Sequence, residues 1–298
     1  MGAADVIPGV SGGTIAFITG IYEELLQSIK SIDLKALKLF FSGKFHEFWR
    51  KINGNFLLAV VAGIGISIFS LARLMTWLLH HHPIPLWSFF FGLIIASTFL
   101  VAKDITKWNA VNVIGAIAGA VAAYLITALS PSSTPDTWWF IILSGAIAIC
   151  AMILPGISGS FILLLLGKYE FIMTAVGELD VKVIVLFAIG AIAGIISFSH
   201  FLTWLLKNYR NITIAVLAGF MVGSLNKIWP WKQTLETYLD SHGELQPFKE
   251  ANVMPGTFAQ LTGTDPQLWQ AILLCLVGFL LIFVLESAGK RLAARKVE

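Results

Sequence analysis

The sequence predicts an all-α, polytopic integral membrane protein built from two related halves of inverted topology. Hydrophobic residues make up 57% of the 298 residues and charged residues only 12%, about half of the roughly 25% that is usual in soluble domains. The chain also repeats itself. Residues 8–33 match residues 155–180 at a constant offset, and each copy opens with Pro-Gly-x-Ser-Gly in apolar sequence. Such a repeat is typical of membrane transporters with two-fold pseudosymmetry.

Six apolar runs are long enough to cross ~30 Å of hydrocarbon as helices, which takes ~20 residues. They cover 56–80, 84–102 and 109–130 in a first half of residues 1–137, and 183–206, 212–228 and 268–286 in a second half of residues 138–298. Two further apolar segments, 2–29 and 138–178, are interrupted by the Pro-Gly motif, and we expect re-entrant helical hairpins there. Irregular backbone at membrane depth survives only beside protein or a water-filled cavity.

Lysine and arginine predict the orientation. If each hairpin returns to the side it entered, one face carries the basic segment 30–55, the short loops after residues 102 and 206, and the C-terminal tail. The positive-inside rule assigns this face to the cytoplasm, so we expect a cytoplasmic C-terminus and an outer loop at 229–267. Three spans separate the hairpins, an odd number, so the second half is expected to be inverted relative to the first.

The two Pro-Gly breaks are the predicted ligand site. Each proline ends one half-helix, and the next begins at once with N–H groups that lack intrahelical acceptors, an arrangement that suits an anion. The predicted binding residues are Pro8, Gly9, Ser11, Gly12, Gly13 and Thr14 in the first copy, and Pro155, Gly156, Ser158, Gly159 and Ser160 in the second. The alternative is a packing kink whose serine caps its own helix, but two copies in inverted halves favour the site.

Ionisable groups inside apolar spans are costly and usually face a cavity or a partner. Arg73 and His200 occupy matching positions of the two halves, and we expect both to face the anion, His200 as a pH-sensitive group. The alternatives are snorkelling of Arg73 to the interface and an ordinary hydrogen bond for His200. Asp5 is predicted to couple transport to a proton or cation. Glu23 and Glu170, which are repeat-equivalent, are further coupling residues or mark the hairpin ends.

No metal, cofactor or nucleic-acid site is expected. Cys150 and Cys275 each lie in an apolar run and are predicted to be buried, inert thiols. The string Gly9-x-Ser11-x-Gly13 matches the nucleophile elbow of serine hydrolases, but a broken apolar segment lacks the strand, histidine and acid that this elbow needs. The basic residues are spread over loops and do not gather with aromatics on one face.

Three stretches are similar to one known family: GAADVIPGVSGGTIAFITGIYE at 2–23, LPGISGSFILLLLGKYE at 154–170 and TIAVLAGFMVGSLNKIWPWK at 213–232. They resemble the PopT family of polyprenyl-phosphate transporters. The resemblance implies a flippase, not an enzyme, that returns undecaprenyl phosphate from the outer to the inner leaflet of the bacterial cytoplasmic membrane for cell-envelope glycan synthesis. Its expected partners are that polyprenyl phosphate lipid, the surrounding membrane lipids and a coupling proton or cation.

Two other functions stay open at this point. Undecaprenyl-pyrophosphate phosphatases share the re-entrant repeats, but their PG-x-SRSG motif has an arginine where this chain has Gly12, and their upstream acidic pair is absent here. Phosphoryl transfer would then lack both charge stabilisation and a general base. A small-anion channel or exporter fits the two helix termini equally well.

Overall fold

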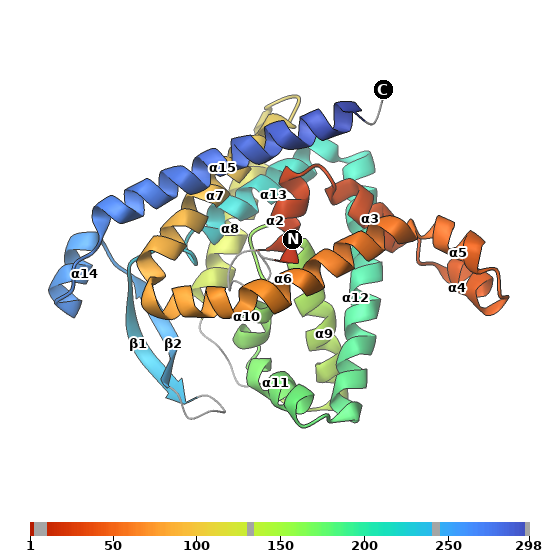
Figure 1. Cartoon of the computed structure of the whole chain (residues 1–298), viewed down its shortest axis with the longest axis horizontal. Helices are drawn as coiled ribbons and strands as arrows, with labels where there is room; N and C mark the ends of the chain where they lie inside the picture. The colour runs from red at the N-terminus through yellow and green to blue at the C-terminus, as the bar shows by residue number, and fades with distance from the viewer. Residues whose placement is uncertain (3–10, 130–133, 240–244, 296–298) are drawn as a thin grey trace.

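The computed structural model describes residues 1–2, 11–129, 134–239 and 245–295 (Figure 1). The first half contains α2 (Gly12–Ile18), α3 (Tyr22–Lys30), α4 (Leu34–Phe41), α5 (Phe45–Lys51), α6 (Gly54–His81), α7 (Pro83–Lys103) and α8 (Ala110–Ala128). The second half contains α9 (Trp138–Ile153), α10 (Gly159–Leu165), α11 (Tyr169–Gly177), α12 (Val181–Asn208), α13 (Arg210–Ser224), β1 (Lys232–Leu239), β2 (Leu245–Asn252), α14 (Pro255–Thr262) and α15 (Leu268–Arg295).

Four of the described helices are long and apolar enough to cross a membrane: α7, α8, α12 and the first 20 residues of α15. The short helices α10 and α11 are apolar enough only when taken together, and they form a pair bent by 112°, as expected of a broken span or a re-entrant segment. The predicted helical, polytopic membrane fold is therefore confirmed, and the chain is a multi-pass membrane protein. The 15 residues of α13 reach only about 22 Å at 1.5 Å per residue, because this helix ends in turns at Ser224 and not at residue 228.

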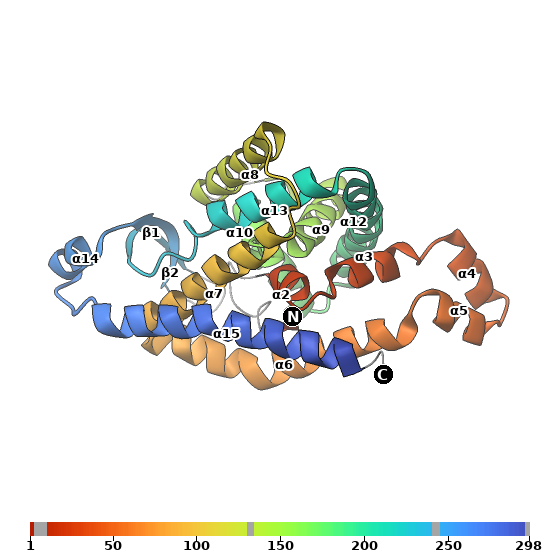
Figure 2. The ribbon, with the colours of Figure 1, turned by 90° about the horizontal axis from the view of Figure 1, so that it is seen from above.

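The duplication seen in the sequence recurs in the element boundaries. The first residues of α2 and α10, Gly12 and Gly159, are 159 − 12 = 147 apart, and the last residues of α3 and α11 are also 147 apart. Both ends of α12 follow those of α6 by 127 residues, as 181 − 54 and 208 − 81 show. Only the first half inserts a helix pair between these blocks, α4 and α5, which project from the body of the molecule (Figure 2). The inverted relation of the halves stays a prediction.

Equivalent helices also pack in the same way. Gly92 of α7 lies against α15 and Gly219 of α13 lies against α8, and a Cβ at either position would approach a backbone oxygen, of Cys275 or Ala116, to 1.9 Å. Small residues at such crossings let helix backbones approach closely inside a membrane. The core between these pairs includes the short helix α2, whose Ala16 is fully buried with Ile94 of α7.

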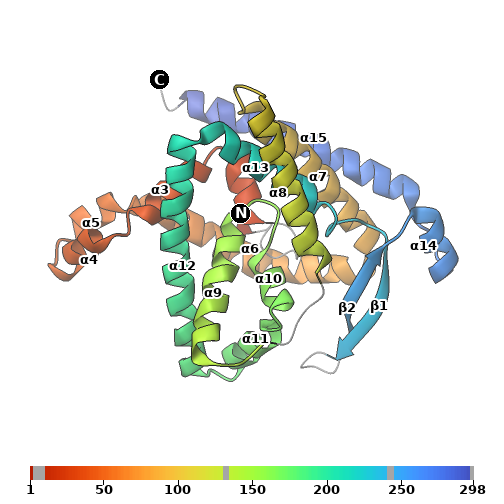
Figure 3. The same cartoon turned by 180° about the vertical axis from the view of Figure 1, so that it is seen from behind.

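The expected outer loop at 229–267 is partly regular, because it contains the antiparallel strands β1 and β2 and helix α14. Trp229 and Trp231 anchor this region, since their indole N–H groups donate to the carbonyl oxygens of Val253 at 2.8 Å and Pro266 at 2.9 Å. Figure 3 shows the β-hairpin and α11 at one end of the molecule. The C-terminal end of α15 and the junctions α7–α8 and α12–α13 lie at the other.

Candidate functional site

The two predicted breaks meet in the interior of the molecule. The C-terminal end of α9 leaves carbonyl groups that no further turn of helix satisfies, and side chains of the first half cover them. Ser11 Oγ donates to the carbonyl oxygen of Met152 at 2.9 Å. Tyr22 OH donates to the carbonyl oxygen of Ile153 at 3.1 Å. Ser11 is fully buried and Tyr22 almost so, so the first hairpin closes the end of the helix that enters the second break.

The first break is packed too tightly to leave its hydroxyl groups open to a ligand. Thr14 Oγ1 accepts the N–H of Gly156, in the second break, at 3.1 Å, and Ser11 Oγ accepts the N–H of Gly13 at 3.0 Å as the cap of α2. A Cβ at Gly13 would lie 2.4 Å from the carbonyl oxygen of Ile153. In this conformation the predicted binding residues Ser11 and Thr14 therefore hold the two breaks together.

The second break has a different environment. Ser158 Oγ accepts the N–H of Phe161 at 3.2 Å as the cap of α10, and it lies 3.1 Å from Ser160 Oγ. Ser160 occupies the position equivalent to Gly13 and stays partly exposed. Gly156 has a φ of +98°, in the region that favours glycine, and a Cβ there would lie 2.7 Å from Ser224 Oγ. This break thus keeps a pair of neighbouring hydroxyls at a half-helix N-terminus.

Of the remaining predicted residues, Pro155, Gly12 and Gly159 are buried beside the breaks. Asp5, Pro8, Gly9 and the side chain of Arg73 lie outside the described residues. His200 is exposed on α12, where its Nδ1 lies 2.9 Å from the carbonyl oxygen of Ile196, one turn earlier. Among the described residues, no hydrogen bond or ion pair joins His200 to either break. The roles of these residues stay predictions.

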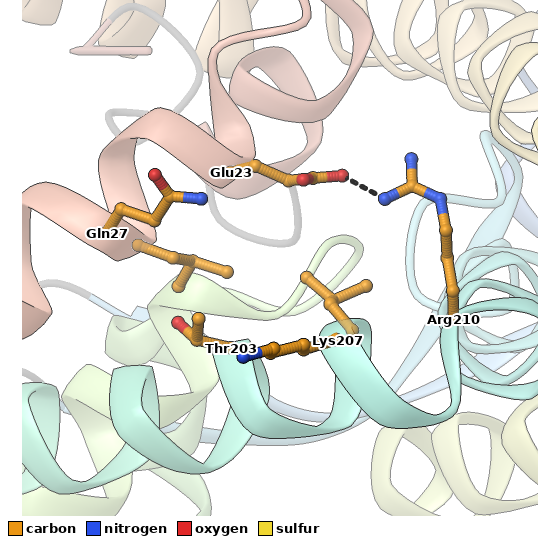
Figure 4. A pocket seen from close by; sticks show the side chains of 7 residues that line it. Glu23, Gln27, Thr203, Lys207 and Arg210 are labelled. Atoms are coloured by element: carbon orange, nitrogen blue, oxygen red, sulfur yellow. Dashed lines mark hydrogen bonds and ion pairs between the residues drawn. The ribbon is translucent and has the colours of Figure 1, made fainter.

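Glu23, a predicted coupling residue, lines a cavity of about 250 Å³ between α3 and the end of α12 (Figure 4). Its carboxylate accepts a hydrogen bond from Arg210 Nη1 at 2.5 Å, and both side chains are about half exposed. The other polar side chains of the cavity are Gln27, Thr203 and Lys207. The repeat-equivalent Glu170 is exposed at the start of α11, so the two glutamates have different surroundings.

Sequence reasoning missed a buried lysine in the second hairpin. Lys168, between α10 and α11, is 1% exposed; it forms an ion pair with Asp136 and donates to the carbonyl oxygen of Thr134 at 2.7 Å. These contacts fasten the bend between α10 and α11 to the segment before α9. The sequence did contain a signal for this contact: a lysine stands at position 168, whereas the equivalent position of the first copy holds the apolar Ile21.

A second missed group joins the β-hairpin to the second break. Lys227 Nζ and Lys232 Nζ lie 3.5 Å and 3.2 Å from one oxygen, Glu250 Oε2. Burial lowers the pKa of Lys232 to about 8, an effect that Glu250 only partly offsets. Burial alone would raise the pKa of Glu250, but the two ammonium groups outweigh it and lower that pKa. The signal in the sequence was two lysines flanking Ile-Trp-Pro-Trp in a chain with few charges.

The described residues include no group of three histidine, cysteine, aspartate or glutamate side chains placed to hold a metal ion. Cys150 and Cys275 are free thiols. Both are partly buried and partly exposed, so they are less buried than expected. Cys150 Sγ lies 3.6 Å from the carbonyl oxygen of Gly194, where α9 packs on α12.

Comparison with known proteins agrees with the resemblance seen in the sequence. A family model described as VCA0040-like, undecaprenyl phosphate translocase-like, matches residues 1–246. A polyprenyl-phosphate transporter of Vibrio cholerae is 47% identical over 291 residues, which cover 98% of this chain and 94% of the relative. One of Staphylococcus aureus is 33% identical over 250 residues, 77% of this chain and 83% of the relative. No solved structure matches. The chain therefore belongs to the VCA0040-like family of undecaprenyl phosphate translocase-like proteins.

Proposed function

We propose that this protein moves undecaprenyl phosphate, or a closely related polyprenyl phosphate, from the outer to the inner leaflet of the bacterial cytoplasmic membrane without hydrolysing it. The lipid carrier would then return to cell-envelope glycan synthesis. The names of the family and of both relatives support transport of this class of lipid. The observation that carries the proposal is the meeting of two helix breaks inside an apolar fold, where Ser11 and Thr14 contact the second break.

The physical problem is the head group. A phosphate with one to two negative charges cannot cross hydrocarbon unaided, because burial of an uncompensated charge is prohibitively expensive. The half-helix N-terminus of α10, the hydroxyls of Ser158 and Ser160, and Arg73 would replace its hydration, while the prenyl tail stays in the lipid. Opening of the contacts between the two breaks would let the head group pass between them.

The proposed topology has inverted halves, 1–137 and 138–298, with the C-terminus in the cytoplasm. The C-terminal end of α15 lies at the same end of the molecule as the α7–α8 and α12–α13 junctions, which carry lysine and arginine, and this supports the orientation (Figure 3). Single cysteines at Ser42, between α4 and α5, and at Thr137, before α9, test it. We expect a membrane-impermeant thiol reagent to label them from opposite sides. Labelling of both from one side would contradict the topology.

Transport is tested with purified protein in liposomes that contain undecaprenyl phosphate. We expect the outer-leaflet phosphate lipid to decrease with time and no inorganic phosphate to appear. Phosphate release would support the phosphatase, and movement of small anions without lipid would support the channel. Arg73→Ala should weaken binding of the phosphate lipid by around 1.5 to 3 kcal/mol. Arg50→Ala, which removes an exposed cation of α5, is the matched control.

The source of energy belongs to the same proposal. Net movement against a gradient requires coupling to an ion, and we assign this role to protonation at Asp5 or His200, with Glu23 and Glu170 as further groups. Liposomes with an imposed pH gradient test the assignment: lipid movement should follow the direction of the gradient. Movement that ignores it would remove the proton from the mechanism.

A further inference from the structure

Two lysines and one glutamate lie together where the turn after α13 meets the β-hairpin. Lys227 and Lys232 approach the same oxygen of Glu250, and the side chains are 23%, 11% and 24% exposed, respectively. Two positive charges and one negative charge leave a net charge of +1. Because the cluster is partly buried, this charge is screened much less by salt than a surface charge is.

Aromatic rings hold both ammonium groups in position. Lys227 Nζ lies 4.9 Å from the ring centroid of Phe161 on α10, and Lys232 Nζ lies 4.9 Å from that of Trp87 on α7. Cation–π contacts of this length are attractive. The lysines therefore have a support other than Glu250, and they would stay close together if the carboxylate moved away.

The cluster adjoins the second break. Phe161, beneath Lys227, is in the first turn of α10, and its N–H donates to Ser158 Oγ, next to Ser160. The first half has no counterpart, because Leu100 and Ile105 stand 127 residues before Lys227 and Lys232. An excess of positive charge thus lies beside the hydroxyl pair of the second break.

We propose that Lys227 and Lys232 form a binding site for a phosphate monoester group, which receives the lipid head group before it reaches the second break. The inference rests on the proposed function and adds the place where the substrate first binds, at the β-hairpin end of the molecule (Figure 3). A phosphate monoester carries about −1.5 to −2 charges near neutral pH and three strong acceptor oxygens. It therefore bridges both ammonium groups and displaces Glu250, which holds the lysines while the site is empty.

A purely structural role for the cluster makes a different prediction. If Glu250 only pins β2 to the body through the lysines, loss of any member loosens the hairpin, and all three substitutions act in the same direction. If the lysines bind phosphate, removal of Glu250 removes a competitor and a repulsive charge. Substitutions of the lysines and of the glutamate then have opposite effects on affinity.

The test measures binding of undecaprenyl phosphate to the full-length protein in detergent, with inorganic phosphate as the competitor. We expect Lys227→Gln and Lys232→Gln to raise the Kd about tenfold or more, the size of a lost charged hydrogen bond. Glu250→Gln should lower the Kd by about threefold or more, because it removes like-charge repulsion. Lys182→Gln, at an exposed lysine in the first turn of α12, is the matched control and should change nothing.

The outcomes separate this site from the function. Wild-type protein that neither binds nor moves the lipid would refute the proposed function. Wild-type protein that moves the lipid, with Lys227→Gln and Lys232→Gln variants that bind like Lys182→Gln, would overturn the site alone. A Glu250→Gln variant that loses affinity together with the lysine variants would assign the cluster to hairpin attachment. Competition by inorganic phosphate at equal concentration would identify a site for free phosphate and not for the lipid.

Discussion

The first and second breaks share a sequence pattern but differ in their surroundings. In the first copy, Ser11 bonds to the backbone at the end of α9, where Gly13 also packs, and Thr14 bonds to the backbone of the second break. In the second copy, Ser160 stands at the position of Gly13 and has room for its side chain. Phe161 stands at the position of Thr14, and its ring contacts the ammonium group of Lys227. The duplicated motif therefore gives the same helix start twice, while the contacts around it differ, and we propose that the first copy closes the interior and the second contacts the ligand.

The largest expected effect concerns the serine hydroxyls of the two breaks. Ser11→Ala removes the cap of α2 and the hydrogen bond to the carbonyl oxygen of Met152, so we expect a loss of about 2 to 3 kcal/mol in stability. Ser160→Ala, which removes a partly exposed hydroxyl of the second break, should stay within about 0.5 kcal/mol of the wild type. Thermal unfolding of both variants in detergent measures the difference. Equal losses would show that the first break does not close the second.

A smaller loss of stability is expected at the residue that follows the repeated glycine, which is Gly13 in the first copy and Ser160 in the second. Gly13→Ala places a Cβ against the carbonyl oxygen of Ile153, and such overpacking costs typically 1 to 3 kcal/mol. Ser160→Ala keeps the side-chain volume nearly unchanged and is the matched control. We expect only the glycine variant to unfold at a lower temperature, and unchanged unfolding of Gly13→Ala would contradict the contact.

Removal of the hydroxyl group from the two repeat-equivalent tyrosines should change stability by a smaller amount. Tyr22→Phe removes the hydroxyl that donates to the carbonyl oxygen of Ile153, so we expect a destabilisation of about 1 kcal/mol. The repeat-equivalent Tyr169 is partly exposed, and Tyr169→Phe should stay within about 0.5 kcal/mol of the wild type. Chemical unfolding of the two variants side by side tests this, and a larger effect at Tyr169 would reverse the comparison.

The last expected effect concerns pH beside the second break, and it is measured in affinity and not in stability. The pKa of Lys232 is lowered to about 8, so its ammonium charge is present below pH 8 and is lost above it. The titratable groups that act on it are Glu250 and Lys227. Affinity for the phosphate lipid should therefore fall by up to about tenfold between pH 7 and pH 9. A Lys232→Gln variant should show a flatter profile, and identical profiles would remove Lys232 from the site.

Much of the helical framework follows from local pattern. The ends of α6 and α12 lie within two residues of the spans expected at 56–80 and 183–206, because long apolar runs have few alternatives in a membrane. The strands of 229–267 were not predicted, since half of their residues are polar and tryptophan contacts with distant carbonyls hold them.

The predicted site was harder to derive than the framework. Glycine and proline locate the breaks from sequence, but the bonds from Ser11 to Met152 and from Thr14 to Gly156 join residues more than 140 positions apart. No local pattern reports such a contact. The same holds for Lys227, whose proximity to Phe161 depends on how α13 and α10 pack. The sequence therefore located the breaks but not the contacts on which the proposed division of roles between them rests.

The most direct test of that division is the affinity of folded protein for undecaprenyl phosphate, measured with Ser11→Ala and with a Ser158→Ala, Ser160→Ala double variant below their unfolding temperatures. Each hydroxyl that contacts the head group contributes about 0.5 to 1.5 kcal/mol. We predict that the double variant binds more weakly by about 1 to 3 kcal/mol, while folded Ser11→Ala binds like the wild type. Weaker binding by Ser11→Ala, with unchanged binding by the double variant, would contradict the account.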